Sequence, residues 1–162
     1  MDNKTLRETD ENVVILPGAK VCGDVTFGPG CSVWYNAVIR ADGAPVRIGT
    51  NTNLQDNVVL HGDAGPMTIG DNVTVGHGAI LHGRTIGDRT LIGMGAILLQ
   101  GCEIGADCIV AAGAVVTGKT RAPDGSMLMG SPARVVRALT EEDKARNLAA
   151  ARGYAAGAEE YR

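Results

Sequence analysis

A chain of 162 residues with a formal net charge of -3 has the length of a single domain. It lacks the excess of positive charge that binding to nucleic acid or to an anionic membrane surface requires, so we expect neither as a partner. Aromatic residues make up only 3% of the chain, whereas 23 residues are glycine. This composition predicts a narrow core of small aliphatic side chains with glycine at its corners.

The N-terminal stretch MDNKTLRETDENVV is polar and contains no charged segment followed by an apolar one. No apolar stretch approaches the roughly 20 residues needed to cross a bilayer. We therefore expect a cytoplasmic protein. Three of the four cysteines, Cys31, Cys102 and Cys108, occupy small inward positions of the repeat described next, and no CxxC pair occurs. They are predicted to be buried thiols in a reducing compartment, and we assign them no chemistry.

A step of six residues governs the chain up to about residue 117. Apolar residues recur at this step in four runs: Ile15, Val21, Phe27, Val33; Ile48, Leu54, Leu60; Ile69, Val75, Leu81; and Ile86, Ile92, Leu98, Ile104, Val110, Val116. This hexapeptide period predicts a parallel β-helix in which three hexapeptides make one coil. Residues about eighteen apart then stack on the same face. A helical period of 3.6 is not sustained anywhere before about Arg134.

The repeat is interrupted at three places, all close to histidines. Residues 41–47 form an insertion that contains Gly43 and Pro45, which predicts a loop leaving the prism. A second insertion, GDAGPM, covers residues 62–67, and one residue is missing between Leu81 and Ile86. Irregularities in a repeat are favoured positions for a functional site.

Charged residues flank the first insertion. Arg40 and Asp42 lie at its start, and Gln55 and Asp56 lie in the next coil. Arg40, Asp42 and Asp56 could form ordinary surface salt bridges, which contribute little to stability. Beside a metal that bridges subunits, they could instead form an ion-pair network that fixes the register of the two subunits.

All three histidines lie between Leu54 and Gly83. His61 follows Leu60 and His82 follows Leu81, so both take the same outward position on one face and should stack roughly 4.8 Å apart at the backbone. His77 follows Val75 by two residues and leaves a different face. The simplest way to gather three imidazoles is a cyclic homotrimer in which His77 of one subunit meets His61 and His82 of another.

Three neutral imidazoles on a divalent ion leave one coordination position open for water, whose pKa falls towards about 7. The resulting hydroxide could attack CO2 or an activated carbonyl. Gln55 and a nearby acid are candidates for orienting the bound water. A structural metal that only staples the trimer remains open.

The repeat from Ile86 to Thr117 carries no histidine and is predicted to be scaffold. From Thr140 the pattern changes: Thr140 and Asp143 resemble a capping box, and alanine-rich sequence follows. We predict one helix over about 140–160, packed on the prism or on a neighbouring subunit through Leu148, Ala151, Ala155 and Ala158. The chain is accordingly divided into a β-helix domain over 1–136 and a C-terminal helical region over 137–162.

Residues from about Val13 to Val136 resemble the γ-class carbonic anhydrase family of left-handed β-helix proteins. The specific motifs are VIRAD at 38–42, NLQDNVVLHGD at 53–63 and IGDNVTVGHGAILHG at 69–83. IGMGAIL at 92–98 also matches, and GSPARVVR at 130–137 is shared with hexapeptide acyltransferases. The left hand of the all-β coil is implied by this resemblance alone, because parallel crossovers are normally right-handed.

The resemblance implies zinc-dependent reversible hydration of CO2 to bicarbonate by a metal-bound hydroxide at a subunit interface, with Fe2+ or Co2+ as replacement metals. By resemblance, the site consists of the metal ligands His61, His82 and the adjacent subunit's counterpart of His77, the pocket residues Gln55 and Asn53, and the intersubunit ion-pair residues Arg40, Asp42 and Asp56.

The chain also departs from the family. Well-known active members have a glutamate directly after the residue matched by Asp42, and a long acidic loop after the first histidine that supplies a second glutamate for proton transfer. Here Gly43 and the short GDAGPM stand in those places. We therefore expect a slow hydratase or an enzyme that uses its hydroxide on another substrate.

Two further functions stay open. Hexapeptide trimers often bind acyl-CoA between subunits, which makes acyl transfer or thioester hydrolysis an alternative. The other is a non-catalytic trimer stapled by metal. Tyr154 of the C-terminal helix is a candidate pocket residue.

Overall fold

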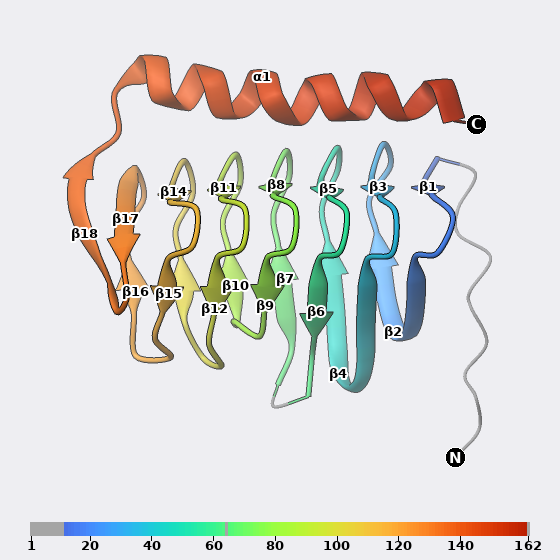
Figure 1. Ribbon diagram of the computed structural model, residues 1–162, viewed down its shortest axis with the longest axis horizontal. Helices are drawn as coiled ribbons and strands as arrows, with labels where there is room; N and C mark the ends of the chain where they lie inside the picture. Colours follow the sequence, from blue (N-terminus) through green and yellow to red (C-terminus); the bar gives the residue numbers. More distant parts are fainter. Residues whose placement is uncertain (1–11, 64, 162) are drawn as a thin grey trace.

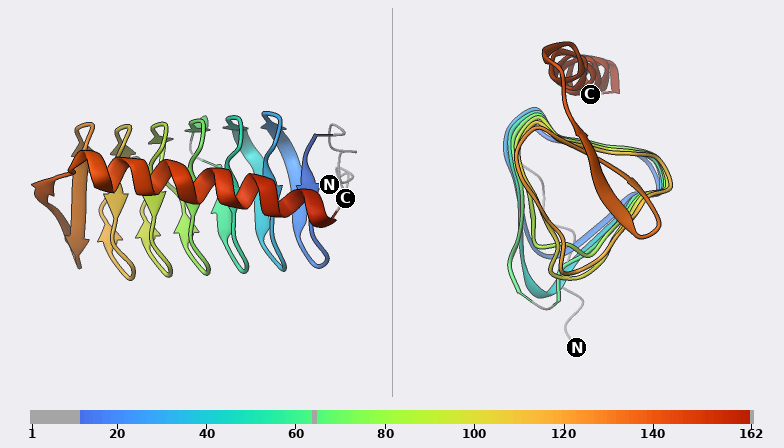
Figure 2. Two further views of the ribbon diagram at one scale, coloured as in Figure 1. Left: turned by 90° about the horizontal axis from the view of Figure 1, so that it is seen from above. Right: turned by 90° about the vertical axis from the view of Figure 1, so that its left-hand side faces the viewer.

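The computed structural model describes residues 12–63 and 65–161. Short parallel strands wind into stacked coils that together form a triangular prism, and one long helix lies along the outside of one face (Figures 1 and 2). The view down the prism axis shows the coils superimposed as a triangle with the helix above one side (Figure 2). The parallel β-helix with a C-terminal helix is thus confirmed.

We name the three faces by what they carry. The helix face contains β1 (Val14–Ile15), β3 (Ser32–Val33), β5 (Asn53–Leu54), β8 (Thr74–Val75), β11 (Leu91–Ile92), β14 (Ile109–Val110) and β17 (Ser126–Gly130). The histidine face contains the first halves of β2 (Lys20–Phe27) and β4 (Val38–Ile48), then β6 (Val59–His61), β9 (Ile80–Leu81), β12 (Ile97–Leu98) and β15 (Val115–Val116). The third face contains the second halves of β2 and β4, then β7 (Met67–Ile69), β10 (Thr85–Ile86), β13 (Glu103–Ile104) and β16 (Arg121–Ala122).

The register of neighbouring coils follows the hexapeptide step. Ile48 pairs with Ile69, Leu54 with Val75 and Leu60 with Leu81, one pair on each face. All six side chains point inward and are buried. Because each inward residue stacks on its counterpart in the next coil, the residue that follows it is also stacked, but outside the prism. This is the geometry that aligns His61 with His82.

The cysteines are free thiols. Cys31, Cys102 and Cys108 are buried in the core and Cys22 is half-buried, as the repeat predicts. Burial raises the pKa of the Cys31 and Cys102 thiols to about 11.

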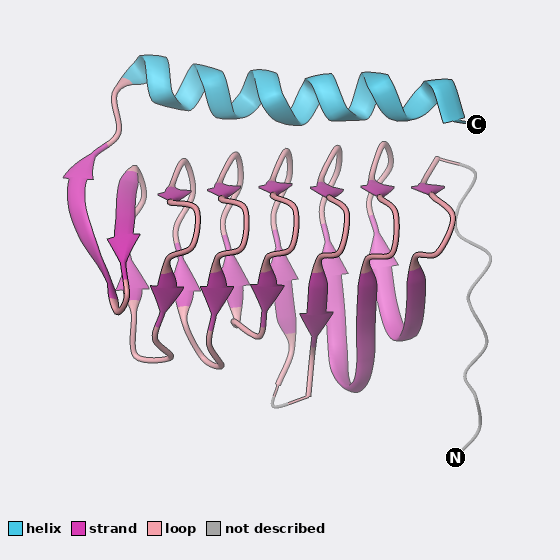
Figure 3. Cartoon of the chain, in the orientation of Figure 1, coloured by secondary structure: helices cyan, strands magenta, loops and turns pink. Residues whose placement is uncertain are grey.

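The expectation of a loop at residues 41–47 is wrong. These residues belong to β4, which continues without a break from the histidine face round the corner to the third face. β2 follows the same bend, and their pairing shifts register between Gly23 and Val25. The paired strands supply hydrogen-bond partners across the insertion, so Gly43 and Pro45 bend a strand here and do not end it. The extended corner is visible as the long lower end of β4 (Figure 3).

After β18 (Ala133–Ala138) pairs antiparallel with β17, the chain enters α1 (Glu141–Ala158), which ends in a short 3₁₀ turn over Glu159–Tyr161. Thr140 caps α1 in a complete capping box with Asp143, as predicted. Eighteen residues span about 27 Å, close to the roughly 29 Å of six coil spacings, so the helix runs back along the whole helix face. None of the helical segments in the described part of the chain has the length and apolarity of a membrane span.

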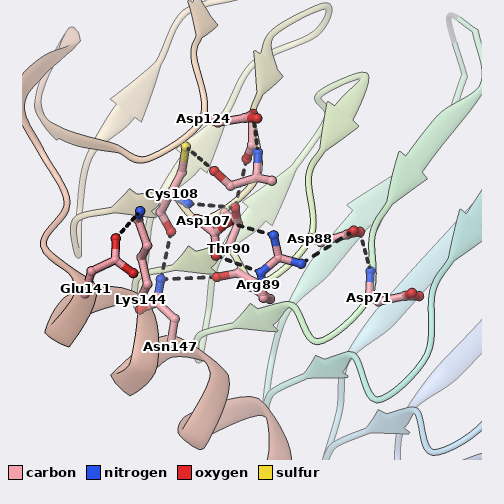
Figure 4. Close-up of polar contacts among 12 residues, drawn as sticks. Asp71, Asp88, Arg89, Thr90, Asp107, Cys108, Asp124, Glu141, Lys144 and Asn147 are labelled. Carbon is pink, nitrogen blue, oxygen red and sulfur yellow. Dashed lines mark hydrogen bonds and ion pairs between the residues drawn. The ribbon is translucent and has the colours of Figure 1, made fainter.

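Asn147 ties α1 to the prism. It is buried, and its amide donates to the carbonyl of Arg89 at 3.2 Å and to that of Cys108 at 3.1 Å, one on each of two successive coils (Figure 4). Arg89 in turn donates two hydrogen bonds to Asp107. Ala151 and Ala158 are buried below the helix, and Trp34 packs edge-on against Tyr154 at 5.3 Å between ring centroids. The helix therefore packs on its own prism, which is one of the two surfaces that the sequence analysis allowed.

Candidate metal centre

His61 and His82 lie together at the edge where the histidine face meets the third face. The strands β6 and β9 pair in register; His61 ends β6 and His82 directly follows β9. The Nδ1 atom of His61 lies 3.2 Å from Nε2 of His82. Two nitrogens bound to one tetrahedral Zn2+ at the usual Zn–N length lie about 3.3 Å apart. The pair therefore has the spacing of two ligands on one ion.

Asp42 sets the orientation of the first imidazole. Its Oδ1 atom lies 3.1 Å from Nε2 of His61, and its Oδ2 atom accepts a 2.7 Å bond from Arg40. The Arg40 guanidinium holds the pKa of the Asp42 carboxyl below its ordinary value, and the hydrogen bond with His61 acts in the same direction. An ionised Asp42 favours a proton on Nε2 of His61, which leaves the Nδ1 lone pair facing His82. A carboxylate behind a ligating histidine is the usual support of a metal site.

A carboxylate that the sequence analysis did not single out joins the two histidines. Oδ1 of Asp63 lies 3.4 Å from Nε2 of His82, and Oδ2 lies 3.9 Å from Nδ1 of His61. One ligand atom from each of His61, Asp63 and His82 falls within 4.8 Å of the other two. The available sequence signal was that Asp63 follows His61 by two residues and can return to the same side of the chain.

His77 lies at the opposite edge of the histidine face, in the turn between β8 and β9. The turn is closed by Gly78 at a φ of 67°, a conformation that favours glycine. Nδ1 of His77 lies 2.7 Å from Oδ2 of Asp56, so its Nε2 atom carries the free lone pair. Its side chain is 45% exposed. Within one chain, His77 is not part of the cluster formed by His61 and His82.

Gln55 and Asn53 lie beside His77 and not beside the other two histidines. The backbone amide of His77 donates to Oε1 of Gln55 at 3.2 Å, and Nε2 of Gln55 donates to Oδ1 of Asn53 at 3.2 Å. Asn53 donates to the hydroxyl of Thr74 at 3.0 Å. All three polar side chains are buried and connected, so Gln55 is held in one orientation next to the His77 turn.

Two cavities adjoin these groups. One, of about 300 Å³, is lined by His61, Asp63 and His82, and also by Arg84 and Gln100. The other, of about 530 Å³, lies between α1 and the helix face, and its lining is mostly aliphatic, with Gln55, His77 and Tyr154 at one end. Burial, together with the negative charge of Asp56, raises the pKa of the Tyr154 hydroxyl. Tyr154 therefore reaches the His77 half of the candidate site.

The donors fit a divalent transition-metal ion. Imidazole nitrogens and a carboxylate are ligands for Zn2+, Fe2+ and Co2+ alike. Nε2 of His61 is paired with Asp42 and Nδ1 of His77 with Asp56, and a carboxylate on the nitrogen that does not bind the metal is the usual support of a ligating histidine. Within one chain these histidines form two separate groups, one at each edge of the histidine face.

The repeat and the whole chain have recognisable relatives. Residues 85–118 match the family described as bacterial transferase hexapeptide (six repeats). The chain is 44% identical over 141 residues to gamma carbonic anhydrase 1, mitochondrial, of Arabidopsis thaliana, an alignment that covers 83% of this chain and 51% of that protein. It is 41% identical over 124 residues to a carbonic anhydrase of Geobacillus kaustophilus, covering 76% and 68% respectively. Among solved structures, a hexapeptide transferase family protein from Anaplasma phagocytophilum superposes with a TM-score of 0.90 at 34% identity, covering 95% of this chain and 92% of that one.

The coil and the matched repeat define a hexapeptide-repeat β-helix protein. Within this class, the relatives show that the chain belongs to the γ-class carbonic anhydrase-like family. The chain spans about half the length of the Arabidopsis relative.

Proposed function

We propose that this protein is a zinc-dependent enzyme that reversibly hydrates CO2 to bicarbonate at sites completed by two subunits of a homotrimer. The observation that carries the proposal is the 3.2 Å approach of His61 Nδ1 and His82 Nε2 in a cavity of about 300 Å³. Relatives named as carbonic anhydrases support the reaction. When bound, the ion supplies a Lewis acid that generates a nucleophile from water at neutral pH.

The distribution of the half-sites supports a ring of subunits. His61 and His82 lie at one edge of the histidine face and form one half-site, and His77 at the other edge forms the second. The first half-site of one subunit must therefore meet the second half-site of its neighbour. Such a head-to-tail contact is heterologous, and it closes into a cyclic oligomer when the rotation permits. In a trimer, the three histidine faces would point at the three-fold axis.

The outer surface of the histidine face is suited to this burial. Val38, Val59, Ile80, Ile97 and Val115 are paired in register and form one outward aliphatic row across the coils. Val59 is 40% exposed and Ile80 is 43% exposed in the single chain. A contiguous apolar row between two polar edges is characteristic of a subunit interface.

The chain's own side chains would then divide the work. Asp42, held ionised by Arg40, orients His61, and Asp56 orients His77. Gln55 is fixed on Asn53 and on the backbone of His77, so it would enter the composite site together with His77 and present its amide to CO2 or bicarbonate. Arg40, Asp42 and Asp56 would also face the neighbouring subunit as intersubunit ion pairs.

Metal content and CO2 hydration, measured together, test the proposal. Protein purified without chelator or nickel resin should carry about one zinc or iron per chain, and His61→Ala should lose it. His77→Ala should lose hydration while remaining a trimer, because the aliphatic row persists. Wild-type protein without metal but with an intact trimer would refute the proposal, and loss of assembly in His77→Ala would favour a metal staple.

Acyl transfer or thioester hydrolysis is the second candidate, and the cavity below α1 favours it. The cavity of about 530 Å³ is larger than CO2 needs. Its mostly aliphatic lining would accept an acyl chain next to His77. A series of acyl-CoA thioesters of increasing chain length, assayed with and without metal, distinguishes this activity from hydration.

A further inference from the structure

The His61 and His82 pair has a third donor within the same chain. We propose that Asp63 is itself a metal ligand, so that each subunit holds the ion through two histidines and one carboxylate before a neighbour contributes His77. This inference rests on the proposed metal site. It adds a fourth protein ligand to the three histidines, so the water of the proposed function would occupy a fifth coordination position.

The separations match a shared ion. Bonds of about 2.0–2.2 Å place neighbouring ligand atoms about 2.9 Å apart at right angles and about 3.3 Å apart in a tetrahedron. Nδ1 of His61 and Nε2 of His82 are 3.2 Å apart, and the two oxygens of Asp63 each approach a different imidazole: Oδ1 lies 3.4 Å from Nε2 of His82 and Oδ2 lies 3.9 Å from Nδ1 of His61. One ligand atom of each residue lies within 4.8 Å of the other two, so a rotation of the Asp63 carboxylate that turns one oxygen towards both imidazoles would place the three donors on one ion.

The backbone holds Asp63 at this position. The amide of Gly62 donates to the carbonyl of Arg40 at 2.9 Å, and the carbonyl of Gly62 accepts from the amides of Gly43 and Ala44 at 3.3 and 3.0 Å. The chain leaving β6 is thus fastened to β4 one residue before Asp63. A side chain at Gly43 would place its Cβ atom 2.7 Å from the Cα atom of Asp63, so the close approach requires glycine there.

In the described part of the chain, no lysine or arginine forms an ion pair with the Asp63 carboxylate. Its ion-pair partners within 4.0 Å are the two histidines, whereas Asp42 is paired with Arg40. The Asp63 side chain is 44% exposed and opens onto the cavity with His61 and His82. A carboxylate with no other cation and two imidazoles beside it completes the two-histidine, one-carboxylate set that binds Fe2+ and Zn2+ in other proteins.

Zinc affinity in a double-mutant cycle tests this ligand without relying on activity. Wild type, Asp63→Asn, His77→Ala and the double variant are titrated against a fluorescent zinc chelator, with His61→Ala as the loss-of-site control. Glu160→Gln, an exposed position on the terminal 3₁₀ turn, makes the same change of charge away from the site. Unfolding of the metal-free variants verifies that the fold is unchanged.

We expect His77→Ala to retain zinc with reduced affinity, and Asp63→Asn to lower the affinity at least about 10-fold in both backgrounds, since even supporting residues of metal sites have effects of this size. An affinity of Asp63→Asn equal to that of Glu160→Gln would overturn the inference while leaving the proposed function intact. If wild type bound no better than His61→Ala, the proposed site itself would fail.

Discussion

A site shared between subunits should be restored by mixing two inactive variants. His61→Ala removes one half-site and leaves His77 available to a neighbour, whereas His77→Ala removes the other half and leaves His61 and His82 intact. These half-sites lie at opposite edges of the histidine face. A neighbouring pair with His77→Ala on the His61 side of the contact and His61→Ala on the His77 side therefore contains one complete set of ligands.

The size of the effect follows from counting contacts. In a ring assembled at random from equal amounts of both variants, each contact has the required order of subunits with a probability of about one quarter, because heterologous contacts are directional. CO2 hydration of the mixture should therefore reach about a quarter of the wild-type rate per chain, although each variant alone is inactive. Co-expression with two different tags and purification over both isolates the mixed trimers, in which the fraction is higher.

A matched pair of variants provides the control. His61→Ala mixed with His82→Ala damages the same half-site in every subunit, so no contact can be complete and the mixture should stay inactive. Restoration in this control, or no restoration in the mixture of His61→Ala with His77→Ala despite verified mixed trimers, would refute a site formed between subunits.

Three further predictions concern stability and reactivity. Asn147→Ala should lower the free energy of unfolding by about 1–3 kcal/mol in urea, because it removes two hydrogen bonds between a buried amide and the prism, whereas the exposed Arg152→Ala on the same helix should have little effect. The guanidinium of Arg137 and the backbone of Thr140 lower the pKa of Asp143 from 3.8, so this carboxyl stabilises the fold above that pH and its contribution is lost as the pH falls through the lowered value. Urea midpoints between pH 5 and pH 2 should fall more steeply for wild type than for Asp143→Asn; parallel curves would contradict this. At pH 8 a thiol reagent should modify Cys22 alone in the folded protein and all four cysteines in urea.

The stacking of His61 on His82 was predictable because it follows from the fixed period of the repeat. A strand of fixed period places every outward residue relative to its inward neighbour, and in-register pairing of coils then aligns positions that are equivalent in the repeat. His77 was separated from the pair by the same reasoning. The capping box of α1 was equally local, since Thr140 and Asp143 lie within one turn.

The path of residues 41–47 and the role of Asp63 depend on contacts that the sequence does not display. Gly43 and Pro45 are turn signals when considered alone. They lie within a strand because β2, more than fifteen positions earlier, bends with β4 and pairs with it on both sides of the corner. Asp63 ends the motif of the first histidine, but its position depends on the hydrogen bonds that fasten Gly62 to β4.

The two departures from active family members form one structural unit. A glutamate at position 43 could not be accommodated here, because any Cβ atom at Gly43 would collide with the backbone of Asp63. Conversely, Asp63 approaches His61 and His82 only because Gly62 is hydrogen-bonded to β4 on both of its polar groups. The shortened loop therefore removes the space for one acidic side chain and brings another directly to the histidines. If Asp63 is a ligand as we propose, the acid at the site binds the ion itself, and a glutamate introduced at position 43 would have to displace Asp63 before it could serve in proton transfer.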